Sequence, residues 1–193
     1  MNGRQDEQAD DLLGIDRFQD DGPFKQDFDT FKQLIKNSPN PDQIRYPRLV
    51  SFIGETSAGK STRIKMLIEY DQAKYEANKS MFKAPVPGST LHDSTPTSAD
   101  VHLYVDPATW EEERPIFYAD CEGLNAGERI TIGAHSRRQT RIDTSRKLGL
   151  RARSLEWATS DQTRTRQYAV TQLYPRLLYT FSDVVVFVLN NPK

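Results

Sequence analysis

Four short runs of apolar residues, each bounded by polar or turn-forming residues, predict the strands of this chain. They cover residues 48–53, 101–105, 116–119 and 184–189. The last run is rich in β-branched residues, which favours a central strand. Apolar residues at helical spacing predict helices over 24–36, from Ser61 onward, and over 162–179 with a kink at Pro175. Strands alternating with helices predict an α/β fold, with a mostly parallel sheet and helices on both faces.

The segment between the first long strand and the helix after it carries the clearest chemical pattern. Residues 54–61 fit the phosphate-binding pattern G-x-x-x-x-G-K-[ST] at every fixed position. Glycines let the backbone curl so that N–H groups point at phosphate oxygens, and the following helix directs its positive dipole end there. A chance match is the alternative, but the predicted strand and helix on either side argue against it. The expected nucleotide contacts are Gly54, Glu55, Thr56, Ser57, Ala58, Gly59, Lys60, Ser61 and Thr62.

Within this loop, two side chains have specific expected roles. Lys60 would reach the β- and γ-phosphates, and the Ser61 hydroxyl would bind magnesium. A second segment, Asp120-Cys121-Glu122-Gly123, directly follows the third strand. There Asp120 would hold magnesium through water, and the N–H of Gly123 would face the γ-phosphate.

A threonine in the loop before the second strand would complete the magnesium shell and sense the γ-phosphate. Thr97 is the preferred candidate, because it lies four residues before the strand that begins at Val101. Thr95 and Thr90 are alternatives. Each of these threonines is equally well explained as an ordinary turn residue.

Taken together, these motifs resemble a known class, the translation-factor-related GTPases. Residues 55–61 resemble the loop of the dynamin-like GTPases, and residues 120–124 resemble the D-x-E-G-L of guanylate-binding proteins and atlastins. The resemblance covers residues 47–132 and 162–190. It implies a P-loop NTPase fold, binding of GTP or GDP with Mg²⁺, and hydrolysis of GTP. It also implies catalytic positions at Thr56, Ser57 and Thr97, and self-association as a homodimer through the nucleotide face.

Two departures from the family pattern bear on catalysis and on base selection. Leu124 stands where Ras-like enzymes have a glutamine that positions water, so this chain lacks that glutamine. Dynamin-like and guanylate-binding proteins lack it as well. The guanine-reading N/T-K-x-D motif is absent, and Asn190-Asn191 is a poor substitute. The sheet is therefore expected to lack its last two strands, which leaves one edge unpaired. A nucleotide-dependent regulatory module that does not hydrolyse, and an ATP-using P-loop protein, remain alternatives.

Composition and charge add the domain organisation. Of the 193 residues, 36% are hydrophobic and 27% charged, as in a soluble globular protein, and the net charge of −1 gives no general attraction to nucleic acid. Residues 1–22 are acidic and poor in large apolar groups, which predicts a disordered tail. Residues 23–46 are expected to form an amphipathic helix and linker, and residues 47–193 a partial GTPase domain.

Two segments of the chain mirror each other in charge. Residues 1–29 contain nine acids and three bases, whereas residues 133–166 contain nine bases and three acids. The basic insert, residues 133–160, is most simply a solvated loop; a surface for a partner, a lipid or nucleic acid and an internal arginine finger are the alternatives. Nucleic acid is not expected, because Trp157 is the one aromatic residue near these arginines. We hypothesise that the acidic segment folds over this insert.

The sequence also predicts a cytoplasmic location. A single cysteine, Cys121, cannot form an internal disulfide, which fits a reducing compartment. The N-terminus has no apolar run of the secretory kind, and Val184–Leu189 is far shorter than the roughly 20 residues of a membrane span. Nothing in the sequence supports membrane contact or names a protein partner.

Overall fold

The computed structural model describes most of the predicted strands and helices. The described residues are 10–16, 24–27, 30–36, 38, 44–74, 82–85, 101–124, 152–154, 160, 162–163 and 165–190. Thr97 and its alternatives Thr90 and Thr95 lie outside these residues, as does most of the basic insert.

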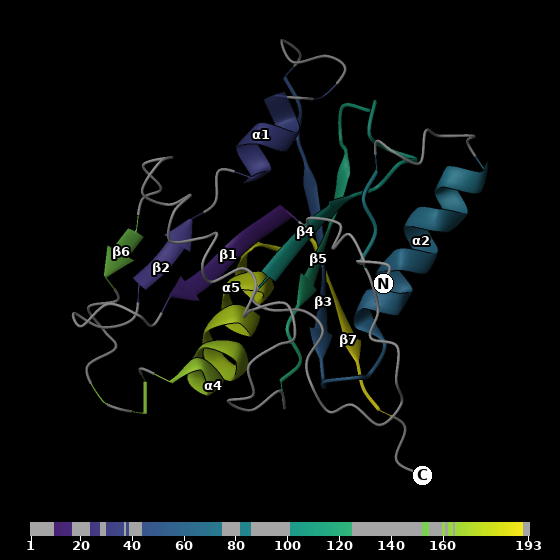
Figure 1. Ribbon diagram of the computed structural model, residues 1–193. Helices are drawn as coiled ribbons and strands as arrows, with labels where there is room; N and C mark the ends of the chain where they lie inside the picture. Colours follow the sequence, from purple (N-terminus) through teal and green to yellow (C-terminus); the bar gives the residue numbers. More distant parts are fainter. Residues whose placement is uncertain are drawn as a thin grey trace, which may run out of the picture.

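A seven-stranded sheet with the order β6-β2-β1-β4-β5-β3-β7 forms the centre of the fold (Figure 1). Its strands are β1 (Asp10–Asp16), β2 (Phe24–Asp27), β3 (Arg48–Gly54), β4 (Val101–Val105), β5 (Ile116–Cys121), β6 (Ala152–Ser154) and β7 (Val184–Val188). β3 runs parallel to β5 and β7, whereas the four other pairings are antiparallel. The α/β class is confirmed, but the sheet is mixed rather than mostly parallel, because β1, β2 and β6 extend it beyond β4 in antiparallel register.

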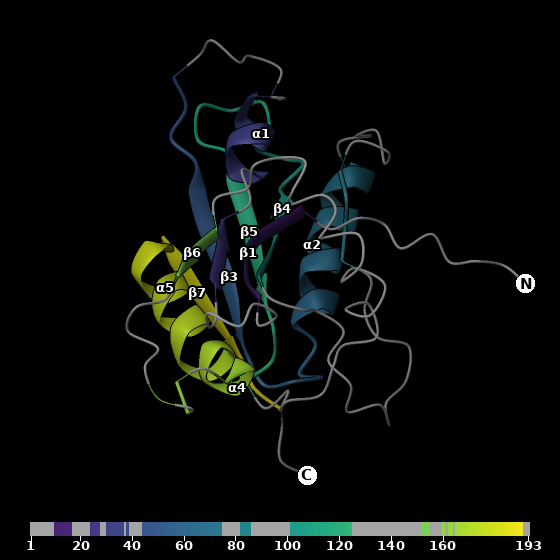
Figure 2. The same cartoon turned by 60° about the vertical axis from the view of Figure 1, so that its left-hand side comes forward.

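Helices cover both faces of this sheet, as predicted. The helical elements are α1 (Thr30–Lys36), α2 (Lys60–Lys74), α4 (Arg166–Tyr168), a π-helical stretch η1 (Ala169–Leu173) and α5 (Tyr174–Phe181). Figure 2 shows α2 on one side of the strands and α4 and α5 on the other. Ile64 and Ile68 of α2 are fully buried on one face, and Val170 and Tyr174 are buried on the other. Within the described part of the chain, no helix combines the length and apolar character needed to cross a bilayer.

The last helical segment changes its hydrogen-bond pattern next to Pro175. The N–H of Tyr174 donates to the carbonyl of Ala169, five residues earlier, instead of four. Proline has no N–H to continue the α-helical ladder, and a π-helical turn is one way to accommodate that loss. The π-helical stretch directly precedes Pro175, and the kink predicted at this proline stays a prediction.

The N-terminal segment differs from the prediction. Residues 10–16 form β1 instead of a disordered tail, and residues 24–27 form β2 instead of the first turn of a helix. Among the described residues of this predicted helix, Thr30–Lys36 are helical. Without β1, one edge of β4 would carry unpaired N–H and C=O groups. β1 pairs with that edge, and β2 pairs with β1. Strand pairing thus determines the structure of residues 24–27, although the apolar residues of 24–36 have helical spacing.

Backbone pairing also joins the acidic and basic segments. β6, which comes from the basic insert, pairs antiparallel with β2, and Lys25 stands opposite Arg153 in the register. The two segments are therefore neighbours in the sheet. That their opposite charges hold them together stays a prediction.

β7 lies at one edge of the described sheet and not at its centre. Val184 is 50% exposed and Phe187 is 63% exposed. A β-branched composition reports a preference for strand structure and burial, but it does not fix the place of a strand in the sheet. That the sheet lacks its last two strands stays a prediction.

A cluster of polar side chains ties the C-terminal half of α2 to the turn between β4 and β5. Asp106, which is 2% exposed, accepts hydrogen bonds from Thr109 Oγ1 (2.7 Å) and from the Tyr118 hydroxyl (3.1 Å). Burial raises the pKa of Asp71 above its usual range, and a hydrogen bond to Asp106 adds to this effect, while Lys74 acts in the opposite direction.

We expect Asp71→Asn to raise the melting temperature at neutral pH. Because the folded-state pKa of Asp71 lies above the unfolded value of about 3.9, the stability contribution of this group falls as the pH rises through that interval. Asparagine donates to Asp106 without a charge, so the gain should be present at about pH 7 and vanish near about pH 3.5. Circular dichroism melts at both pH values check this, with Glu69→Gln on the same helix as control. A gain of equal size at both pH values would contradict the raised pKa of Asp71.

Candidate functional site

The loop of residues 54–61 joins β3 to α2 and has an unusually curled backbone. Gly54, Ser57 and Gly59 have φ angles of 154°, 62° and 89°. Alternation of left- and right-handed conformations turns successive N–H groups to one side, which forms a concave anion-binding surface. α2 begins at Lys60, so its positive dipole end lies at the same place. Among the described residues, Ser57 is the one non-glycine with a positive φ, and such strain is concentrated at functional sites.

Close backbone contacts fix this loop against the ends of two strands. A Cβ atom on Gly54 would overlap the carbonyl group of Val188 at the end of β7. One on Gly123 would overlap the backbone N and Cα of Thr56. The N–H of Leu124 also donates to the Gly54 carbonyl at 3.0 Å. The loop and residues 123–124 therefore meet backbone to backbone.

Lys60 is the buried cation of the site. It is 6% exposed, and its Nζ donates to the carbonyls of Gly54 (3.2 Å) and Glu55 (2.7 Å). Burial lowers the pKa of Lys60 below its usual value, and the nearby acidic groups, Asp120 first among them, act in the opposite direction. A desolvated ammonium group interacts more strongly with an anion than a hydrated one does. Lys60 is thus placed to bind a negatively charged group above the loop.

Ser61 and Asp120 form the second element of the site. The Ser61 hydroxyl donates to Asp120 Oδ2 at 2.6 Å, and Asp120 is fully buried. β3 and β5 are parallel, so the loop after β3 and the carboxylate near the end of β5 lie at the same edge of the sheet. A serine that donates its proton to a carboxylate presents its oxygen lone pairs outward, as a hard cation requires.

This pair fits magnesium better than a metal held by protein alone. Within the described residues, no group of three or more His, Cys, Asp or Glu side chains is arranged to bind a metal ion. Magnesium keeps several waters and is often bound by one or two protein groups together with substrate phosphates. The Ser61–Asp120 pair therefore suits an ion that arrives with a phosphate ligand.

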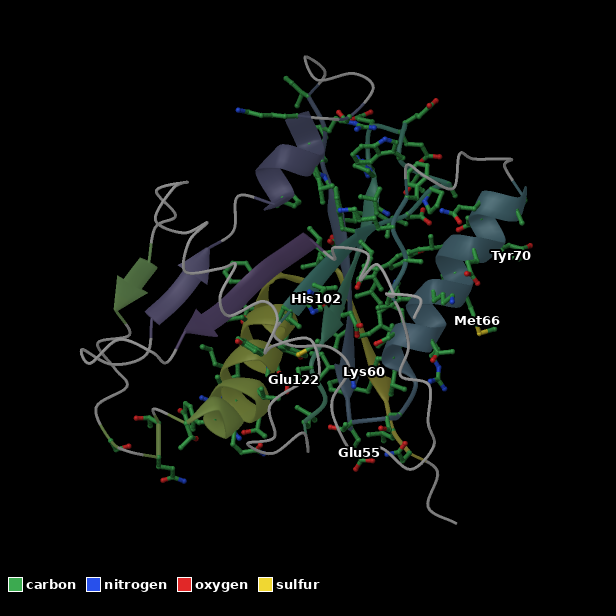
Figure 3. The ribbon with its side chains drawn as sticks, viewed as in Figure 1. Glu55, Lys60, Met66, Tyr70, His102 and Glu122 are labelled. Atoms are coloured by element: carbon green, nitrogen blue, oxygen red, sulfur yellow. The ribbon has the colours of Figure 1, made fainter. Side chains whose placement is uncertain are left out.

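Two buried polar residues at this site received no role from the sequence. Glu122 is fully buried, and its negative charge acts on Lys60; Figure 3 shows both side chains near the loop that carries Glu55. His102 is 3% exposed and stands directly opposite Asp120 in the β4–β5 register. The spacing of Glu122, two residues after Asp120, is a signal that the sequence offered. His102 had no such signal, because its register depends on the geometry of a ten-residue connection between β4 and β5.

Asn190, two residues after the end of β7, also contacts the loop. The Asn190 N–H donates to a carboxylate oxygen of Glu55, and its side-chain Nδ2 donates to the Thr56 carbonyl, both at 3.4 Å. From the sequence, Asn190 is only a poor substitute for a base-reading residue. In the structure it supports the loop.

The remaining predicted residues divide by exposure. Ser57 and Thr62 are exposed, whereas the Thr56 hydroxyl is buried and has no hydrogen-bond partner among the described residues. The Leu124 side chain is half-buried and packs against the apolar core. Thr97 lies outside the described residues. The structure thus brings together the loop, Asp120 and Gly123. Thr56 lies next to Gly123 with its hydroxyl buried, whereas Ser57 is exposed.

The assignment of this site rests on its geometry and on the motifs in the sequence. Comparison with protein-family models, with curated proteins and with solved structures gave no match for this chain.

Proposed function

We propose that this protein binds a guanine nucleotide with Mg²⁺ through the loop of residues 54–61 and hydrolyses GTP. The observation that carries the proposal is the pairing of Ser61 with the buried Asp120 beside the curled loop and Lys60. A P-loop NTPase fold is part of the same proposal, supported by the parallel strands β3, β5 and β7 and by α2 after the loop. The preference for guanine rests on the resemblance of the motifs to GTPases.

Phosphate binding follows from the loop and from Lys60. The N–H groups of the loop would bind the phosphate oxygens, and the dipole of α2 favours the negative charge at this position. Lys60 would exchange its contacts with the Gly54 and Glu55 carbonyls for the β- and γ-phosphates. This exchange replaces bonds from the ammonium group to neutral carbonyls with bonds to anionic oxygens, which adds the attraction between opposite charges.

Ser61 and Asp120 would hold the magnesium ion, Ser61 directly and Asp120 through water. The ion supplies neutralisation of the charge on the β- and γ-phosphate oxygens. Gly123 would offer its N–H to the γ-phosphate, and Thr97 would complete the magnesium shell. Removal of magnesium by a chelator is therefore expected to weaken nucleotide binding.

Hydrolysis would proceed by in-line attack of water on the γ-phosphate, with the protein contributing position and charge. Thr56 and Ser57 are the candidate groups in the loop. The Thr56 hydroxyl faces the α-carbon of Gly123, because a Cβ built there would overlap it. Thr56 is therefore the better candidate to orient the attacking water near the γ-phosphate.

The second candidate function is a nucleotide-dependent regulatory module that does not hydrolyse. It is favoured by Leu124, whose side chain packs against the core and has no polar group to position water. Turnover measured with and without a monovalent cation separates the two, since some dynamins use a bound cation at this step. Turnover in either condition excludes the second candidate.

The proposed function is tested by binding of a fluorescent GTP analogue with magnesium, in competition with unlabelled GTP and ATP. We expect binding that GTP displaces far better than ATP and that Lys60→Ala weakens strongly. Removing a direct charged contact to phosphate costs about 2–3 kcal/mol, which corresponds to a loss of affinity on the order of 10²-fold. Equal displacement by ATP would contradict guanine selectivity and favour an ATP-using P-loop protein.

Lys65→Ala is the matched control for Lys60→Ala. Lys65 lies on the same helix, but its side chain is exposed and pairs with Glu69 at the surface. We expect its replacement to leave nucleotide affinity unchanged. If the folded wild-type protein binds neither nucleotide, nucleotide binding is not the function of this chain.

A further inference from the structure

His102 and Asp120 stand next to a pair of tyrosines on one face of the sheet. His102 alternates with Tyr104 along β4, and the cross-strand partners of the two residues on β5 are Asp120 and Tyr118. Tyr104 and Tyr118 pack with Ile64 and with Ile68 of α2. Side chains two residues apart on a strand share a face, so His102 lies on the face that α2 covers.

The imidazole cannot reach solvent along the sheet. β4 is paired on both sides, with β5 and with β1, and Asp11 occupies the register position opposite His102 on β1. His102 is 3% exposed. Burial of an imidazole without a hydrogen bond costs free energy that an apolar ring at this position would avoid. The imidazole therefore takes its polar contacts from groups inside the fold.

The register places Asp11 of β1 and Asp120 of β5 on the two sides of His102, and of these two residues Asp120 belongs to the candidate site. Directly opposite residues of an antiparallel pair have Cβ atoms about 4.5–5.5 Å apart, well within reach of an imidazole and a carboxylate. The same carboxylate accepts the 2.6 Å hydrogen bond from Ser61 through Oδ2. A second contact from the side of β4 would fix the rotation of the carboxylate about its Cβ–Cγ bond.

We propose that His102 is a positioning residue that holds the Asp120 carboxylate in the orientation in which it accepts the Ser61 hydroxyl. The expected consequence is that His102 lowers the magnesium concentration needed for nucleotide binding. This consequence rests on the proposed function. Groups that orient the ligands of a metal change its affinity by about 10–100-fold when they are removed. His102 acts through Asp120 and touches neither nucleotide nor ion.

The test compares His102→Leu with His102→Asn and His102→Gln. We expect His102→Leu to raise the magnesium concentration for half-maximal binding of the fluorescent GTP analogue about 10–100-fold. Binding without magnesium should change little. One of the two amide variants should stay close to wild type, because asparagine keeps a nitrogen near the Nδ1 position and glutamine keeps one near Nε2.

Tyr104→Leu is the control for a purely structural effect. It removes a buried side chain from the same face of the same strand, one step farther from Asp120. We expect a lower melting temperature and an unchanged magnesium requirement. If His102→Leu and Tyr104→Leu shift the magnesium requirement equally, or if neither amide improves on leucine, the positioning role is excluded.

Crystal structures of the ligand-free wild type and His102→Leu separate this inference from the proposed function. We expect the Ser61–Asp120 contact of 2.6 Å to be kept in the wild type and broken in the variant. An unchanged contact overturns the inference whether or not nucleotide binds. A broken contact in a protein that binds no nucleotide supports the positioning role and refutes only the proposed function. If His102→Leu does not fold, the less effective amide variant takes its place.

Discussion

Replacing Gly54 by alanine is expected to destabilise the protein by at least about 3 kcal/mol, or roughly 6–12 °C in melting temperature. Gly54 ends β3, which joins β5 to β7, and its φ of 154° is strained for any residue with a side chain. The added methyl group would also overlap the carbonyl of Val188. Because that carbonyl belongs to the backbone, it can move only if β7 moves with it.

Gly59→Ala separates the two sources of this loss. Gly59 also has a positive φ, at 89°, but a Cβ atom there would meet only the end of the flexible Arg63 side chain, at 3.1 Å. We expect this control to cost only the backbone strain, about 1–3 kcal/mol. Thermal and urea unfolding measure both variants. If Gly54→Ala is no less stable than Gly59→Ala, the contact with Val188 does not hold the loop in place.

The sequence predicted the elements that each carry a strong local pattern. The apolar runs of β3, β4, β5 and β7 and the amphipathic α2 were predicted close to their observed bounds. Burial of alternate or successive apolar residues determines these elements locally, so a single sequence shows them. The fixed residues of the loop were found in the same way, and the structure brings Ser61 and Asp120 into contact as the motifs implied.

Pairing between distant segments could not be predicted in this way. β1 has the sequence Asp-Asp-Leu-Leu-Gly-Ile-Asp, whose acids favour disorder, and it becomes a strand through its pairing with β4. The edge position of β7 likewise depends on which strands lie beside it. A sequence pattern reports how a segment is buried, whereas sheet order depends on contacts that are far apart in the chain.

The same reason explains which site residues were missed. His102 and Asp120 are eighteen residues apart, and the register of β4 against β5 alone brings them together. Asn190 reaches the loop only because β7 is the parallel neighbour of β3. Catalytic motifs are contiguous and visible in a sequence, but the residues that orient them are scattered along it.

Gly123→Ala is expected to weaken GTP binding on the order of 10²-fold and GDP binding much less. The new methyl group would overlap the backbone N and Cα of Thr56 and its hydroxyl, so the loop must move away from the end of β5. In the proposed function, this displacement removes the N–H of Gly123 from the γ-phosphate, which GDP lacks. A hydrogen bond to a charged group contributes about 1.5–3 kcal/mol, which gives the expected size of the effect.

Leu124→Ala is the matched control, because it changes the next residue without adding an atom near the loop. Its side chain packs against the core, while its N–H, which donates to Gly54, stays in place. We expect a lower melting temperature, because the variant loses the core contacts of a partly buried leucine side chain. We expect the ratio of GTP to GDP affinity to stay unchanged. The two affinities are measured by competition against the same fluorescent analogue. If Gly123→Ala keeps the wild-type ratio, this glycine does not read the γ-phosphate, and the contact with Thr56 is only a packing contact.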